Sequence, residues 1–147
     1  MPVAQFNIAR TLYPHGDPRL AEFFDNIPRM NTLAERSPGF LWRLRDDTQA
    51  HKDLFANEPR MTMTLSLWQD VDSLRHFTFK TLHRVFRSRT AEWFEPLGAA
   101  YLVIWDVPKG HHPDHLEAWE NLTALRRDGP TSTRFGTKAL IPEGASS

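Results

Sequence analysis

The sequence of 147 residues contains no cysteine. This absence excludes disulfide scaffolds, thiolate metal sites and a cysteine nucleophile, and it is compatible with a reducing cytoplasm. The opening residues, MPVAQFNIAR, have neither a basic head nor a long apolar run, so they predict neither a signal peptide nor a membrane span. We therefore expect a soluble, cytoplasmic protein.

The chain also has no excess of charge of either sign. Lysine plus arginine equals aspartate plus glutamate at 18 each, so no overall positive field attracts it to nucleic acid or to an anionic membrane. Nucleophilic triads, glycine-rich phosphate loops and helical HExxH pairs are missing as well, which disfavours hydrolases and kinases. The expected partner is a small molecule or another protein.

Apolar residues, in contrast, are plentiful. They make up 40% of the chain, and aromatic residues make up 12%, which is enough to fill the core of one domain. We expect a single domain over residues 1–142, followed by a flexible tail at residues 143–147.

Hydrophobic periodicity predicts alternating strands and helices. The clearest strand is at residues 60–68, where methionine and leucine alternate with threonine and serine up to Trp68. Residues 46–60 are predicted as a polar loop. The other strands are expected at 4–13, 39–47, 99–108 and 134–142, and the helices at 17–36 with a possible kink at Pro28, from Asp70 or Asp72 to about 94, and from about Pro113 to Gly129.

The predicted order is β-α-β-β-α-β-α-β, which indicates an α+β protein. Its first six elements follow the split βαβ pattern of a ferredoxin-like sandwich, with helices on one side of an antiparallel sheet, and an extra helix and strand follow at the C-terminal end. The other face of the sheet is then uncovered and of mixed polarity, so we expect a second copy of the chain to cover it in a homodimer.

Several segments resemble a bacterial family catalogued as a domain of unknown function: FNIARTLY, SPGFLWRL, LSLWQDVDSLRHFTFKTLHRVFRSRTAEWF, PKGHHP and RRDGPT. This family is placed among the dimeric α/β-barrel proteins, with the antibiotic-biosynthesis monooxygenases. The resemblance implies that fold, but several activities occur in the group. It includes cofactor-free oxygenases, heme-degrading enzymes, heme dehydratases and peroxidases, and proteins with no known reaction.

The chain is similar in a limited way to the heme-degrading members. They carry an asparagine on the first strand, a tryptophan that closes the third strand, and an iron-ligating histidine late in the second helix. Asn7, Trp68 and His83 occupy those elements here, and FKTLH resembles the segment that bears the ligand, although this helix is shorter before it. The resemblance thus implies heme iron as the metal held by His83.

The residues around His83 leave two interpretations open. It is either a partly buried histidine that donates to a carbonyl, or a neutral imidazole in an apolar slot lined by Phe79 and Phe86. Arg87 belongs to a basic run that either clamps a carboxylate or heme propionate or forms the wet face of its helix.

Two further candidate sites follow from composition. Arg43 lies within a strand, where its guanidinium must find a carboxylate, a bound anion or solvent, so it is a pocket candidate. The GHHPDH segment contains imidazole and carboxylate groups that suit zinc or another divalent metal, on His111, His112, Asp114 and His115. Pro113 makes the segment a loop-to-helix transition, which disfavours a dedicated metal site.

Two classes of function remain. The first is a monooxygenase-like redox enzyme, with heme or no cofactor, in which Asn7, Arg43 and Trp68 orient a phenolate-like substrate and stabilise its anion. The second is a non-catalytic dimeric module that binds a hydrophobic ligand or heme. In both, the expected partner is a small hydrophobic or aromatic molecule.

Overall fold

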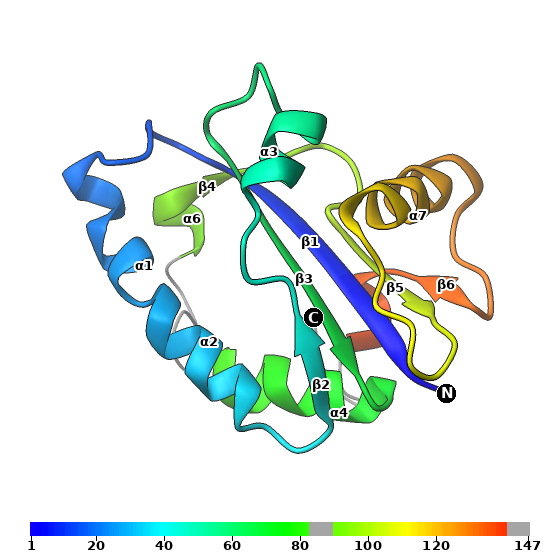
Figure 1. The fold of residues 1–147 in the computed structure, drawn as a ribbon. Coiled ribbons are helices and arrows are strands. Elements are labelled where there is room, and N and C mark those ends of the chain that lie inside the picture. The colour runs from blue at the N-terminus through cyan, green and yellow to red at the C-terminus, as the bar shows by residue number, and fades with distance from the viewer. Residues whose placement is uncertain (83–89, 141–147) are drawn as a thin grey trace.

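The computed structural model describes residues 1–82 and 90–140 (Figure 1). Its strands are β1 (Val3–Thr11), β2 (Phe40–Arg43), β3 (Met61–Trp68), β4 (Phe94–Glu95), β5 (Leu102–Asp106) and β6 (Arg134–Phe135). Its α-helices are α1 (Ala21–Asp25), α2 (Ile27–Glu35), α3 (Thr48–Leu54), α4 (Val71–His76), α6 (Thr90–Trp93) and α7 (His115–Asp128). The 3-10 helices η1 (Pro18–Leu20) and η3 (Thr137–Leu140) and the π-helix η2 (Phe77–Leu82) complete the described elements.

The strands form one antiparallel sheet in the order β2-β3-β1-β5-β6, and β4 pairs with the end of β1. The order β2-β3-β1-β5 is that of the split βαβ sandwich, so the predicted ferredoxin-like α+β class is confirmed. The extra C-terminal elements are α7 and β6. β6 is shorter than predicted because the chain turns into η3, where Leu140 is buried in the core.

The centre of the sheet follows from the alternation of the two longest strands. β1 and β3 pair antiparallel from Val3 opposite Trp68 to Arg10 opposite Met61. Since side chains alternate between faces, this register puts the apolar rows of both strands on one face and their small polar residues on the other.

Capping residues set where the main helices begin. The carboxylate of Asp70 accepts a hydrogen bond from the backbone N–H of Ser73 at 2.8 Å, and that of Asp114 accepts from Glu117 N–H at 2.8 Å. α7 ends before Gly129, which has a φ of 77°. The helix predicted at 17–36 is divided into η1, α1 and α2, and Pro28 lies in the first turn of α2 rather than at a kink.

Both faces of the sheet are covered by helices of the same chain, so the expectation of one uncovered face is wrong. The apolar rows pack under α3 and α7 through Ala50, Ala118, Leu122 and Leu125. The opposite face packs against α2, α4 and η3. The face expected to be uncovered, with the small polar residues of β3, is the one under α2 and α4, and the apolar face is covered by α7 and by α3, which lies in residues 46–60 predicted as a loop. The homodimer remains a prediction, but an uncovered face of the sheet is no longer an argument for it.

None of the helices within residues 1–82 and 90–140 is both long enough and apolar enough to cross a membrane.

Candidate functional site

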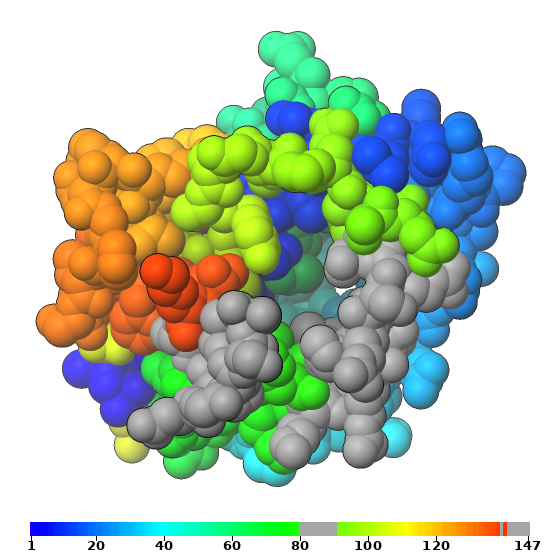
Figure 2. Space-filling view, turned by 180° about the vertical axis from the view of Figure 1, so that it is seen from behind, coloured from blue at the N-terminus to red at the C-terminus, as the bar shows by residue number. Residues whose placement is uncertain are grey.

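The face of the sheet toward α2 and α4 is open near its middle. Thr64 is exposed although β3 lies between β1 and β2, and Asn7, its partner on β1, is half-buried. Figure 2 shows this side hollowed beside residues 95–100, in yellow-green, with the blue of β1 visible on the floor of the hollow. We take this hollow as the candidate functional site.

The floor of the hollow carries a row of hydrogen-bonded polar side chains. Gln5 Nε2 donates to Thr64 Oγ1 at 3.1 Å and to Ser66 Oγ at 2.9 Å. The indole Nε1 of Trp68 also donates to Ser66 Oγ, at 2.9 Å. The amide of Asn7, two residues along β1 from Gln5, has no hydrogen-bond partner among the described residues. Asn7 therefore offers both a donor and an acceptor to a ligand.

Trp68 closes one end of this row as a core residue. Its side chain is buried, stacks on Phe77 with ring centroids 5.1 Å apart, and meets the ring of Phe40 edge-on at 5.5 Å. Its N–H is bonded to Ser66, so in this conformation the side chain belongs to the core beyond the end of the polar row. A catalytic role for Trp68 remains a prediction.

Arg43 lies on the same face, because it pairs with Ser66 across β2 and β3. Its Nε donates to Glu35 Oε1 of α2 at 2.8 Å, and Arg45 lies 3.5 Å from the same oxygen. The hydrogen bond from Arg43 lowers the pKa of the Glu35 carboxyl. Of the partners that the sequence left open, the carboxylate is the one found, so the charge of Arg43 is compensated beside the hollow.

The residues predicted to hold heme are only partly described. Phe79 lies on η2, half-buried against the core cluster that includes Trp68 and Phe77. π-Helical turns are rare and occur frequently at functional sites. His83, Phe86 and Arg87 lie outside the described residues, so heme ligation and propionate binding remain predictions.

The histidines of the GHHPDH segment do not converge on one point. Each has a partner of its own: His111 pairs with Glu117 at 2.7 Å, His115 pairs with Asp53 at 2.7 Å, and His112 stacks on Trp42 at 4.8 Å. In the described part of the chain, no three histidine or carboxylate side chains form a group that could hold a metal ion.

Two features of the surface were missed from the sequence. The first is the hydroxyl row of Thr64 and Ser66, whose signal is the run of small polar residues on one face of β3. The second is a cavity of about 260 Å³ on the opposite face, beside Trp119 and Arg126. Its lining comes from segments far apart in the chain, so no local pattern indicates it.

The family model described as a domain of unknown function, DUF3291, matches residues 2–147. A search among curated proteins finds no match. The fold is similar to a protein of unknown function, NE2512, from Nitrosomonas europaea, at 10% identity over 77% of this chain and 95% of that one, with a TM-score of 0.52.

Two oxygenase structures also align. SnoaB, a cofactor-independent oxygenase from Streptomyces nogalater, has 15% identity over 77% of this chain and 98% of its own, with a TM-score of 0.49. A putative antibiotic biosynthesis monooxygenase from Chloroflexus aurantiacus has 13% identity over the same shares, 77% and 98%, with a TM-score of 0.45.

Proposed function

The chain belongs to the DUF3291 family of domains of unknown function, and from the geometry of the hollow we propose that it is a monooxygenase-like enzyme for a small aromatic molecule. One observation carries the proposal: the unpartnered amide of Asn7 lies opposite the exposed Thr64 on an otherwise hydrogen-bonded floor. Polar groups that line a hollow without a partner are suited to orient a ligand.

The groups around Asn7 favour a ligand with a hydrogen-bonding edge. Asn7 and Thr64 supply hydrogen bonds in the middle of the hollow, whereas the rings of Trp68 and Phe77 are buried in the core beyond the end of the polar row. A phenol suits these groups, since its oxygen accepts a hydrogen bond from the amide of Asn7.

The cofactor-free form of the reaction converts an activated methylene of such a substrate to a carbonyl. The substrate CH2 group and O2 give C=O and H2O, so the substrate supplies all the electrons and its two hydrogens leave in the water. The first step is loss of a proton, which leaves negative charge on the phenolic oxygen. Asn7 stabilises that charge by donating a hydrogen bond, an effect that accelerates such reactions by about 10²–10³ in favourable cases.

In the alternative form heme supplies oxygen activation, and His83 is the predicted ligand. That residue lies outside the described part of the chain, so this form rests on the resemblance alone.

A second candidate is a binding module without turnover. Two side chains predicted to be catalytic favour this candidate, because both already make hydrogen bonds within the protein. The Trp68 N–H donates to Ser66, and the Arg43 guanidinium donates to Glu35. In this conformation the Trp68 N–H is occupied and the charge of Arg43 is compensated.

The substitution Asn7→Ala tests the proposal. Because the amide makes no hydrogen bond among the described residues, the variant should keep the free energy of unfolding of the parent within about 0.5 kcal/mol. It should lower the affinity for phenols about tenfold and the rate of O2 consumption further. The exposed Asn57→Ala is the matched control and should change neither.

The outcomes separate the candidates. Binding with O2 consumption supports the enzyme, and binding without it supports the module. A Soret band after loading with heme, lost in His83→Ala, supports the heme form. Binding that Asn7→Ala leaves unchanged contradicts the assignment of the site.

A further inference from the structure

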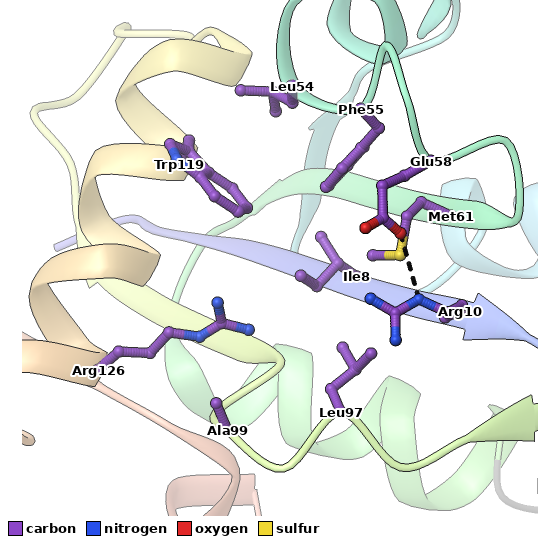
Figure 3. A pocket seen from close by; sticks show the side chains of 10 residues that line it. All are labelled: Ile8, Arg10, Leu54, Phe55, Glu58, Met61, Leu97, Ala99, Trp119 and Arg126. Atoms are coloured by element: carbon purple, nitrogen blue, oxygen red, sulfur yellow. Dashed lines mark hydrogen bonds and ion pairs between the residues drawn. The ribbon is translucent and has the colours of Figure 1, made fainter.

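The cavity on the face opposite the hollow lies between β1, the end of α3, the loop before β5, and α7 (Figure 3). Its wall is mostly apolar: Ile8 and Met61 come from the sheet, and Phe55 meets Trp119 edge-on with ring centroids 5.7 Å apart. Leu54, Leu97 and Ala99 complete the apolar lining. The rings form an angular wall that suits a flat apolar group.

Arginines approach this cavity from two sides, and among the residues that the structure describes one of the two has carboxylate partners. Figure 3 shows the guanidinium groups of Arg10 and Arg126 on either side of Ile8. Arg10 pairs with Glu58 at 3.3 Å and with Glu95 at 3.2 Å, so that end of the cavity is electrically balanced.

Arg126 differs from Arg10 in its partners. Its Nε donates to the carbonyl oxygen of Ala100 at 2.8 Å, which fixes the plane of the guanidinium. Among the described residues no carboxylate pairs with it, and its two terminal nitrogens have no hydrogen-bond partner. A held guanidinium with two free N–H-bearing nitrogens matches the two oxygens of a carboxylate.

We propose that this cavity is a binding site for a small aromatic carboxylate, with the ligand ring against the angular wall of Phe55 and Trp119 and the carboxylate on Arg126. Its volume of about 260 Å³ is just under the range of pockets for drug-sized ligands, roughly 300–1,000 Å³, which limits the ligand to one or two rings. At the other end the charge of Arg10 is compensated by Glu58 and Glu95, so Arg126 sets the orientation of the ligand. The site is independent of the hollow, because the two lie on opposite faces of the sheet.

The test is a titration of the full chain with 3-phenylpropionate. Binding is measured by calorimetry and by the NMR chemical shift of the Trp119 indole N–H. The neutral 3-phenylpropionamide has the same ring and should bind about five- to tenfold more weakly, since a charge-assisted hydrogen bond is replaced by a neutral one. Arg126→Gln should weaken binding of the acid by a similar factor and bring acid and amide to similar affinity.

Two controls locate the effect. Arg127→Gln removes the same charge from the next residue, whose guanidinium pairs with Asp128 at 2.8 Å outside the cavity, and should leave binding unchanged. Ala99→Leu fills the cavity from an exposed loop and should abolish binding of both compounds while the protein stays folded.

Three results would each overturn the proposal. The first is a loss of affinity in Arg127→Gln equal to that in Arg126→Gln. The others are equal affinity of the parent for the acid and the amide, and no binding of the acid at millimolar concentration. Asn7→Ala should have no effect on this titration, so failure here is distinguishable from failure of the proposed function.

Discussion

Two amide side chains on β1 show how much the chemistry of single residues depends on their neighbours. Gln5 and Asn7 lie two residues apart on the same face, and the sequence makes them look alike. Gln5 reaches the hydroxyls of Thr64 and Ser66, whereas Asn7 has no partner in the described part of the chain. The shorter side chain therefore carries the proposed function, and the longer one organises the floor beside it.

Gly39 is a residue whose replacement by any other amino acid should lower the stability of the fold. It has a φ of +85°, and a Cβ at this position would collide with the side chain of Ser73 on α4. Strain and collision act together, so we expect Gly39→Ala to lower the free energy of unfolding by about 2–3 kcal/mol, measured by urea denaturation.

Gly16→Ala is the control for this substitution. Gly16 has a φ of +96° but open space around it, so only the backbone strain of about 1–2 kcal/mol applies. Equal losses in the two variants would contradict the predicted collision with Ser73.

At the scale of elements, α4 packs on the face of the sheet that carries the candidate site, and the start of this helix depends on Asp70. The backbone N–H of Ser73 and then its hydroxyl lower the pKa of the Asp70 carboxyl. A carboxyl group whose pKa is lowered in the folded state stabilises the fold at pH values above its ordinary pKa of 3.8. This stabilisation is lost as the pH falls through the pKa of the folded state.

We therefore expect Asp70→Ala to lower the free energy of unfolding by about 1 kcal/mol at neutral pH. The difference from the parent should shrink as the pH falls below 3.8, because the parent carboxyl is then protonated as well. Asp72→Ala is the control: its side chain is 87% exposed and pairs only with Arg75, so it should cost within about 0.5 kcal/mol. A pH-independent difference for Asp70→Ala would rule out the charged cap.

α3 shows why a short helix can escape sequence analysis. It spans only Thr48–Leu54, and few of its residues are apolar. It is held by contacts with distant parts of the chain: Ala50 and Phe55 enter the core, and Asp53 pairs with His115 of α7. Helices of this length depend on tertiary packing rather than on intrinsic propensity.

At the scale of the whole molecule, the open question is assembly. The apolar rows of the sheet are buried by α3 and α7, so a dimer must use another surface. Leu41 and Met1 are 49% and 76% exposed and line a groove of about 620 Å³ with Leu67. We expect a two-fold dimer at micromolar concentration through this region.

Light scattering checks this expectation. Leu41→Glu should reduce the mass to that of one chain, because it places a charge in an apolar contact. Leu116→Glu alters a residue that is 57% exposed on α7, outside the groove, and should leave the mass unchanged. A parent mass of 17.0 kDa throughout the micromolar range would contradict the dimer.

The sequence by itself determined the order of the main strands and helices and which residues of a strand share a face. These are properties of neighbouring residues: the alternation at 60–68 predicts a strand, and Asp70 and Pro113 indicate helix starts. The split βαβ order then limits the topology to few choices, and the structure has one of them.

Only the tertiary structure decided which helices cover which face, and hence where the sites lie. Alternation places Asn7, Thr64 and Trp68 together, but it does not say whether a helix, solvent or a second chain faces them. The hydrogen bonds from Gln5 to Thr64 and Ser66, between His115 and Asp53, and from Arg126 to the carbonyl oxygen of Ala100 join distant segments. Such contacts depend on how the layers pack in three dimensions, because residues far apart in the chain carry no common period that would reveal them.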